Sequence, residues 1–249
     1  MSNDKIVVER PGKKIFKEGD KLVKLFDKGY SKADILNEAL NQARVEETDL
    51  NIPKIQAVSV VEGCWSITMD FIEGTTLEQL MNEHTEKLDE YLELFVDIQR
   101  NVHTKRVPLL NMTIEKFNRK ISAADLDATM RYELHTRLSG MKRHTKLCHG
   151  DFNPSNIIIT ADGTPYIVDW AHATQGNAAA DVARTYLLFY LAGKGDVAEK
   201  YLKLFCKKSD TAIQYVQKWI PIVAASRLVK APEEEKEFLM RWIDVVEYE

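Results

Sequence analysis

The residues best suited to chemistry lie in one stretch of the sequence, between His149 and Trp170. Asp151 and Asp169 carry carboxylates there, and Asn156 carries an amide. Oxygens of these two kinds are the ligands that Mg²⁺ accepts, and the ion usually takes only one or two of them from a protein. A further carboxylate close to such an ion can accept the proton of a hydroxyl group. The stretch therefore predicts a cation site with a general base beside it.

A β-hairpin is expected to bring two of these side chains together. Two β-favouring runs flank the dipeptide Asp162-Gly163, which is preferred at the centre of a tight two-residue turn. With that turn, the numbers of paired residues sum to 325, so Asn156 faces Asp169. Directly opposed side chains lie on the same side of a sheet, with Cβ atoms about 4.5–5.5 Å apart. We therefore expect both side chains to bind one Mg²⁺ ion.

Asp151 precedes Asn156 by five residues, on the loop that leads into this hairpin. Phosphoryl transfer needs mainly positioning and neutralisation of charge, because its transition state is loose. A carboxylate base together with two metal ligands supplies both. The spacing thus predicts that Asp151 accepts the proton of an acceptor hydroxyl, and no covalent nucleophile is required.

The composition restricts the partners of such a site. The chain has 249 residues, and 45% of them are apolar, which suffices for one large domain or for two lobes. Its formal net charge is −4, and it lacks a stretch dominated by Lys and Arg, which argues against a nucleic-acid partner. The charged start and the absence of a long apolar run predict a cytoplasmic protein without a membrane span.

The two parts of the chain differ in their patterns. The first 72 residues favour strands, with one helix that Ser31 and Asp34 begin as an N-cap pair. The strand signals fall in three runs, namely 5–9, 21–26 and 65–71. After them, Thr75 and Glu78 have the spacing of a capping box. Helical patterns follow over 88–102, 126–141, 180–192, 197–207 and 211–230, the last kinked at Pro221.

The segment HGDFNPSN, followed by IVDW, resembles the catalytic loop and metal-binding segment of the aminoglycoside phosphotransferase and choline kinase family, which is related to the protein kinases. The order of strands, helix and helical part resembles that family over nearly the whole chain. The resemblance implies an α+β, bilobal, protein-kinase-like fold. Residues 1–72 would form a nucleotide-binding lobe with a small antiparallel sheet and one helix. Residues 73–249 would form a larger, mainly helical lobe with the catalytic loop and the acceptor site.

The same resemblance implies roles for individual residues. Asp151 corresponds to the catalytic base, and His149 packs under the loop and orients it. Asn156 and Asp169 correspond to the Mg²⁺ ligands. Asp181 corresponds to a structural aspartate that caps a helix and braces the catalytic loop.

On the nucleotide side, the family implies a lysine on the third strand that contacts the α- and β-phosphates of ATP. Lys24 matches that position, and its place on an apolar strand face calls for an anionic partner. Glu38 is the expected partner from the intervening helix, in preference to Glu46 and Glu47 near the helix end.

Residues 69–73 resemble the segment whose backbone binds adenine, with Phe71 and Ile72 nearest the base. The glycine-rich phosphate loop of the family is reduced to residues 11–14.

The expected activity is transfer of the γ-phosphoryl group of ATP to a hydroxyl of a small molecule such as an amino sugar, a choline-like alcohol or a sugar. A protein-directed kinase and a catalytically weak nucleotide-binding scaffold are the alternatives. Antibiotic resistance does not follow, because this fold serves several acceptor classes. The acidic end of the chain is expected to be a solvated helix face, although Glu247 and Glu249 could instead line the acceptor pocket.

Overall fold

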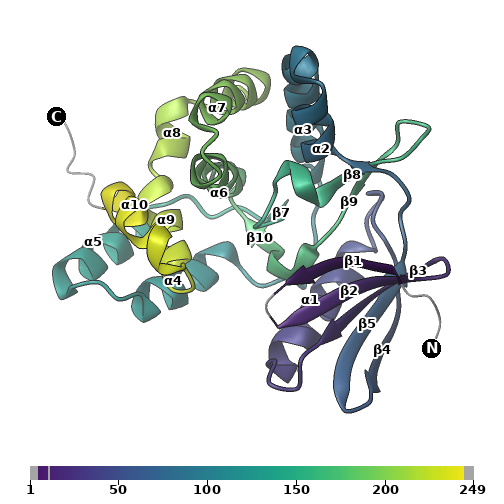
Figure 1. Ribbon diagram of the computed structural model, residues 1–249. Coiled ribbons are helices and arrows are strands. Elements are labelled where there is room, and N and C mark those ends of the chain that lie inside the picture. The colour runs from purple at the N-terminus through teal and green to yellow at the C-terminus, as the bar shows by residue number, and fades with distance from the viewer. Residues whose placement is uncertain (1–4, 11, 244–249) are drawn as a thin grey trace. The chain divides into compact units, whose positions relative to one another are not determined.

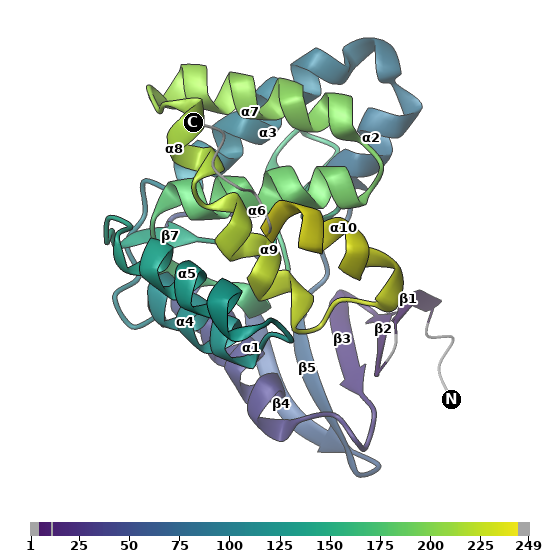
Figure 2. The ribbon, with the colours of Figure 1, turned by 90° about the vertical axis from the view of Figure 1, so that its left-hand side faces the viewer.

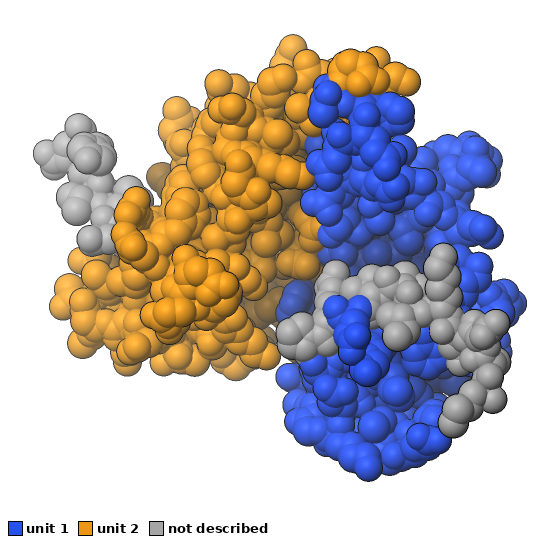
Figure 3. Space-filling model, in the orientation of Figure 1, with its two compact units in different colours: residues 1–85, 154–172 blue, residues 86–153, 173–249 orange. Residues whose placement is uncertain are grey.

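The structure is a computed structural model that describes residues 5–10 and 12–243 (Figure 1). The chain divides into two compact units, coloured separately in Figure 3. Unit 1 comprises Met1–Thr85 and Pro154–His172, and unit 2 comprises Glu86–Asn153 and Ala173–Glu249. Among the helices of the described residues, none combines the length and the apolar character needed to cross a membrane.

Unit 1 is built on a five-stranded antiparallel sheet with the order β1-β2-β3-β5-β4. Its strands are β1 (Lys5–Arg10), β2 (Lys13–Glu18), β3 (Lys21–Phe26), β4 (Ile55–Val61) and β5 (Cys64–Asp70). Helix α1 (Lys32–Val45) begins where expected, because the Ser31 hydroxyl accepts a hydrogen bond from the Asp34 N–H at 3.3 Å. Its buried Ile35 packs against Ile67 of β5 and Phe26 of β3. This core holds α1 to the sheet.

A second sheet in unit 1 joins β6 (Thr75–Thr76), β8 (Ile157–Ile159) and β9 (Pro165–Ile167). The short 3₁₀ turn η2 (Pro154–Asn156) precedes β8, and η3 (Trp170–His172) follows β9.

Helix α2 (Leu77–Glu83) begins one residue later than the predicted capping box. Thr76 is the N-cap and accepts from the Gln79 N–H at 3.2 Å. The prediction for Thr75 was wrong because Thr75 pairs with Ile159 in the sheet.

Unit 2 is mainly helical. Its helices are α3 (Leu88–Val102), α4 (Thr113–Ala123), α5 (Ala128–Ser139), α6 (Ala178–Leu191), α7 (Gly195–Ser209), α8 (Ile213–Gln217), α9 (Ile220–Leu228) and α10 (Glu233–Ile243). A two-stranded sheet joins β7 (Lys146–Cys148) to β10 (Thr174–Gly176). The predicted helix 88–102 is confirmed. The predicted helix 211–230 is instead two helices, because Pro221 lacks an N–H and fits the first turn of α9.

An aromatic cluster connects the helices of unit 2 to the loop after β7. Phe95 of α3 lies 4.7 Å, between ring centroids, from Phe152 on that loop. Phe189 of α6 and Tyr201 of α7 lie 5.8 Å and 5.6 Å from Phe95. Figure 2 shows α6 and α7 running beside each other. The fold thus has the expected α+β composition, with an antiparallel sheet in the N-terminal part and a mainly helical C-terminal part.

Candidate active site

The hairpin that carries Asn156 and Asp169 is present in unit 1, but its register differs from the prediction by one residue. Ile157 pairs with Ile167. The next position outward therefore sets Asn156 opposite Val168, and the Val168 N–H donates to the Asn156 carbonyl at 2.9 Å. Asn156 and Asp169 are not directly opposed, so the expected pairing was wrong.

The turn explains the shift. The Thr160 N–H donates to the Thr164 carbonyl at 3.1 Å, and the Gly163 N–H donates to the Thr160 carbonyl at 2.9 Å. Gly163 has a left-handed φ of 82°. This is a three-residue hairpin loop with glycine in the left-handed position, whereas the prediction assumed a two-residue loop. Both loops favour the dipeptide Asp162-Gly163, so the sequence signal does not separate them.

Asp169 lies just beyond the paired residues and has an unusual backbone. Its φ of 65° falls in the left-handed region, which few residues other than glycine adopt. Its carboxylate Oδ1 lies 3.4 Å from the Lys24 ammonium, and its side chain remains 22% exposed. The direction of this carboxylate is therefore set by the left-handed turn and by Lys24, and not by the strand ladder.

The expected partner of Lys24 is in place. The Lys24 ammonium lies 2.7 Å from the Glu38 carboxylate, and both residues are buried. Burial by itself lowers the pKa of Lys24, but the charges of Asp169 and Glu38 outweigh it and raise that pKa above its ordinary value. Lys13, from the reduced phosphate loop, lies 3.9 Å from the second Glu38 oxygen. Unit 1 therefore holds a charged lysine between two carboxylates.

Phe71 and Ile72 follow the end of β5. The Phe71 N–H donates to the Asp20 carbonyl at 2.9 Å, so this donor is already used within the protein. The Lys17 ammonium lies 4.0 Å from the centre of the Phe71 ring. Lys24 pairs with Ile67, and Phe71 follows Ile67 by four residues, one past the end of β5. At a strand rise of 3.3 Å per residue this separation is about 13 Å.

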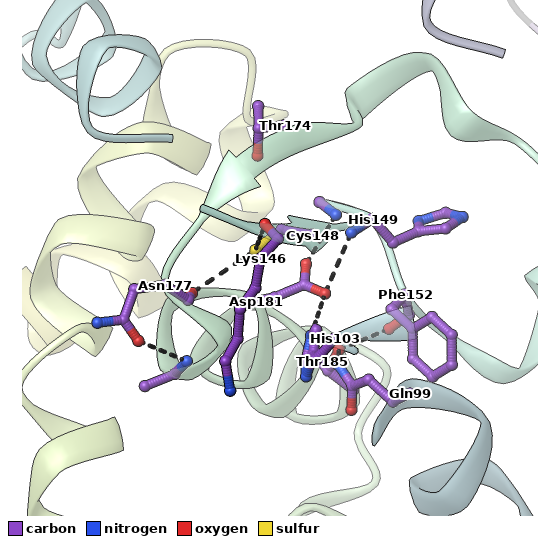
Figure 4. Close-up of polar contacts among 12 residues, drawn as sticks. Gln99, His103, Lys146, Cys148, His149, Phe152, Thr174, Asn177, Asp181 and Thr185 are labelled. Carbon is purple, nitrogen blue, oxygen red and sulfur yellow. Dashed lines mark hydrogen bonds and ion pairs between the residues drawn. The ribbon is translucent and has the colours of Figure 1, made fainter. Parts of the chain in front are cut away.

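In unit 2, the loop after β7 is held by a single buried carboxylate, that of Asp181 on α6 (Figure 4). Asp181 accepts hydrogen bonds from the backbone N–H groups of Gly150 at 2.7 Å and His149 at 3.2 Å. His103 of α3 lies 3.0 Å from it on the other side. Asp181 does not cap the helix, because Asn177 is the N-cap of α6. It braces the loop as expected.

Asp181 is ionised in the folded protein. Burial by itself raises the pKa of this carboxyl, but the hydrogen bonds from His103 and Gly150 and the electrostatic interactions with His103 and His149 lower it below its ordinary value. A lowered carboxyl pKa stabilises the fold above the unfolded-state pKa, and this stabilisation is lost as the pH falls toward the folded-state pKa.

Replacement of Asp181 should therefore change the response to acid. We expect Asp181→Asn to lower the free energy of unfolding by roughly 1–3 kcal/mol at neutral pH, because buried donors lose their charged acceptor. The difference from wild type should shrink as the pH falls below about 4. Urea unfolding at several pH values tests this, with the exposed Asp89→Asn as control. A difference that stays constant with pH would contradict the ionised brace.

Asp151 lies on the braced loop, and its side chain is 27% exposed. The backbone N–H of Asp151 donates to Nδ1 of the fully buried His149 at 3.2 Å. Arg184 of α6 lies 3.3 Å from the Asp151 carboxylate. The structure thus brings His149, Asp151 and Asp181 together in unit 2, and Lys24, Glu38 and Asp169 in unit 1.

Sequence reasoning missed Arg184 and His103. Arg184 follows Asp181 by three residues, so helical spacing places both on one face of α6, and this signal could have identified it. His103 ends α3 and bears no local signal that relates it to the loop.

Acidic residues of α10 pair with basic side chains nearby. Arg227 makes two hydrogen bonds to Glu235, at 2.7 Å and 2.8 Å, and Lys236 lies 2.5 Å from Glu233. Glu247 and Glu249, which were considered for an acceptor pocket, lie outside the described residues.

Comparisons with known proteins give one family match and several matches in fold. The model of the phosphotransferase enzyme family matches residues 2–219. The solved structure of aminoglycoside phosphotransferase APH(4)-Ia is 14% identical, with a TM-score of 0.72 over 98% of this chain and 92% of that one. Choline kinase LicA from Streptococcus pneumoniae is 14% identical, with a TM-score of 0.63 over 98% and 94%. A search of curated protein sequences gives no match.

A third solved structure is that of aminoglycoside phosphotransferase APH(3'')-Id from Streptomyces rimosus in complex with ADP and streptomycin. It is 14% identical, with a TM-score of 0.63 over 90% of this chain and 92% of that one. Likeness at such low identity establishes the fold, which is protein-kinase-like, as expected.

Proposed function

Because the chain belongs to the phosphotransferase enzyme family, we propose that it transfers the γ-phosphoryl group of ATP to an alcohol hydroxyl of a small molecule. The observation that carries the proposal is the buried Lys24 ammonium, 2.7 Å from Glu38 and 3.4 Å from Asp169. A buried cation held between two carboxylates is positioned to bind the phosphates of a nucleotide, because little reorganisation is needed when the phosphates arrive.

The residues of unit 1 bind the nucleotide in this proposal. Lys24 contacts the α- and β-phosphates, and Phe71 and Ile72 lie nearest the adenine. Asn156 and Asp169 offer an amide and a carboxylate oxygen, the donors that fit Mg²⁺. When it is bound there, the ion supplies positive charge to the phosphates. The separation of about 13 Å between the Lys24–Ile67 pair and Phe71 suits an extended nucleotide.

Unit 2 supplies the base. Asp151 takes the proton of the acceptor hydroxyl, and the hydroxyl oxygen forms a bond to the γ-phosphorus. The bond between that phosphorus and the bridging oxygen breaks, so ADP leaves. His149 and Asp181 position the loop through the hydrogen bonds described above.

The relatives support a nucleotide donor and a small acceptor. One solved structure of APH(4)-Ia contains ADP and hygromycin B, and another contains AMP-PNP and hygromycin B. Aminoglycosides and choline are both small molecules with hydroxyl groups. The chain from Trp170 leads through η3 and β10 directly into α6, and this short connection favours a small acceptor over a protein.

The test is ADP formation by the purified protein with ATP, Mg²⁺ and a panel of hydroxylated small molecules. We expect ADP release that requires both Mg²⁺ and one class of acceptor. Nucleotide binding without transfer to any acceptor would instead indicate a scaffold. Phosphorylation of a peptide array, without transfer to small molecules, would indicate a protein-directed kinase.

A further inference from the structure

A cavity of about 570 Å³ lies within unit 2. Its walls are the last turn of α3, the segment that leads into β7, the first turn of α6, and the chain from the end of α7 to α8. Sites for small organic molecules commonly have volumes of about 300–1,000 Å³. The residues proposed above for the nucleotide, the metal ion and the proton transfer do not line this cavity. It is therefore large enough for a ligand of its own.

Apart from histidines, the charged residues that line the cavity are Arg100, Lys146 and Asp97. Asp97 lies 3.3 Å from Arg100 and 2.8 Å from Lys208, and Glu93 lies 3.5 Å from Lys208. The two carboxylates of this group balance its two cations. Lys146 stands outside the group, because its ammonium makes no ion pair or hydrogen bond with any residue that the structure describes. Lys146 therefore adds an excess positive charge to the wall.

The histidine at position 144 reports the sign of the field in the cavity, which it lines. Burial lowers the pKa of His144, and the charges of Lys146, Lys142 and Arg106 lower it further. All three of these groups are cations, and a lowered histidine pKa is the response to a positive field. The Asp181 carboxylate is fully buried and does not line the cavity. An anion is therefore attracted to this wall, whereas a cation is repelled.

The first turn of α6 adds to this field. Asn177 is the N-cap of this 14-residue helix, and Asn177, Ala178 and Ala179 line the cavity. The aligned peptide dipoles place about half a positive charge at a helix N-terminus, and phosphate groups bind at such ends. The start of α6 beside Lys146 is therefore suited to a phosphate group.

One further wall residue, His103, has a nitrogen that lacks a partner. His103 lines the cavity, and its side chain is only 4% exposed. Its Nε2 lies 3.0 Å from the Asp181 carboxylate, while its Nδ1 is buried and has no hydrogen-bond partner among the described residues. A proton on Nε2, toward Asp181, leaves Nδ1 of a neutral ring as an acceptor. Because buried polar groups are nearly always hydrogen-bonded, a hydroxyl of a ligand would complete this site.

The walls of the cavity also hold the catalytic loop. His103 contacts Asp181, whose carboxylate accepts hydrogen bonds from the N–H groups of His149 and Gly150 (Figure 4). Lys146 begins β7, which ends directly before His149. A ligand in the cavity therefore has two short connections to the catalytic loop, one through a hydrogen-bonded side chain and one through the backbone.

We propose that this cavity binds a small organic phosphate with a hydroxyl group, and that the bound ligand acts on the catalytic loop through His103 and β7. Lys146 and the first turn of α6 bind the phosphate group, and Nδ1 of His103 accepts a hydrogen bond from the hydroxyl. The site goes beyond the proposed transfer from ATP, and its test measures binding without turnover.

Proton NMR of the His144 ring tests the binding. The probes are glucose phosphate, gluconate, neutral glucose and inorganic phosphate, and His144→Gln assigns the resonance. We expect glucose phosphate to shift the resonance to saturation and to raise the pKa of His144, because the anion offsets the positive field. Inorganic phosphate should bind at least about tenfold more weakly, since it fills little of the cavity. Glucose should leave the resonance unchanged.

The contrary outcomes are specific. A His144 resonance that no anionic probe shifts would overturn the proposal. A stronger response to gluconate would overturn the choice of phosphate, and equally tight binding of inorganic phosphate would overturn the organic part of the ligand.

Variants of the wall assign the effect to the cavity. Lys146→Met should weaken binding of glucose phosphate at least about tenfold, as expected for loss of one charge-assisted contact, and Lys146→Arg should restore most of it. Arg100→Met, at an exposed position of the wall, is a second variant that should weaken binding without disturbing the fold. Lys203→Met, at an exposed position of α7, is the matched control. Equal binding by wild type and both Met variants of the wall would overturn the site.

The connection to the catalytic loop has its own readout. Saturation with glucose phosphate should shift the backbone amide resonances of His149 and Gly150, and these shifts should be lost in Lys146→Met. Binding seen at His144 without any change at His149 and Gly150 would overturn the action on the loop. None of these measurements requires ATP turnover, so a negative result leaves the proposed function standing.

Discussion

Replacement of Asp151 by Asn is expected to lower kcat by about 10²–10⁴-fold, the usual contribution of a general base. The amide keeps the shape of the side chain but cannot take up the proton of the acceptor hydroxyl. ATP affinity should remain close to wild type, because the proposed phosphate ligands lie on other residues. The measurement is ADP formation with the best acceptor of the panel, together with ATP binding by calorimetry.

The fold should tolerate Asp151→Asn. The ion pair of Asp151 with Arg184 is partly exposed, and such pairs contribute about 0–1 kcal/mol to stability. Asp89→Asn, an exposed aspartate on α3, controls for a general effect of losing a carboxylate. If Asp151→Asn kept a kcat within tenfold of wild type, about 1.4 kcal/mol in activation free energy, Asp151 would not be the base.

Replacement of Lys24 by Met should have the second large effect, on stability as well as on nucleotide binding. The variant leaves Glu38 as a buried carboxylate whose partner at 2.7 Å is gone. Removal of one member of a buried ion pair costs about 3–5 kcal/mol. We therefore expect the urea midpoint to fall markedly and ATP binding to be lost in conditions where the variant is still folded.

Two further variants separate the causes. Lys21→Met changes an exposed lysine on the same strand and should leave stability within about 0.5 kcal/mol of wild type. The double variant Lys24→Met/Glu38→Leu removes the buried charge as well and should regain most of the lost stability. It should not regain ATP binding. Recovery of ATP binding in the double variant would contradict the role of Lys24 as a phosphate ligand.

The parts of the fold that depend on local signals could be predicted from the sequence. Helix α3 has the predicted bounds, because its apolar stripe repeats over four turns. Ser31 is the N-cap of α1 as predicted, because the cap is a local hydrogen bond. The pair of Lys24 and Glu38 followed from the family resemblance, and the structure places them in contact.

The register of the hairpin could not be predicted in the same way. Asp162-Gly163 suits both a two-residue and a three-residue loop, and the choice appears only in the φ of Gly163. That one-residue difference moves Asp169 out of the ladder, where a left-handed backbone directs its carboxylate toward Lys24. A residue can therefore be named as a site candidate from the sequence while its geometry is predicted wrongly.

The position of helix α4 was also beyond the sequence, because the segment was not predicted as a helix at all. In the structure the first residue of α4, Thr113, contacts Thr174 on β10, which pairs with β7. Long-range packing of this kind has no signature in local periodicity.

The most direct test of transfer to a hydroxyl is phosphorus NMR of a mixture of the protein, ATP, Mg²⁺ and the panel of hydroxylated small molecules. A new phosphate monoester resonance on the acceptor should grow as ADP forms, and it should be absent without Mg²⁺ and absent with Asp151→Asn. ADP and inorganic phosphate without any monoester, or a monoester formed as fast by Asp151→Asn, would contradict transfer to a hydroxyl activated by Asp151.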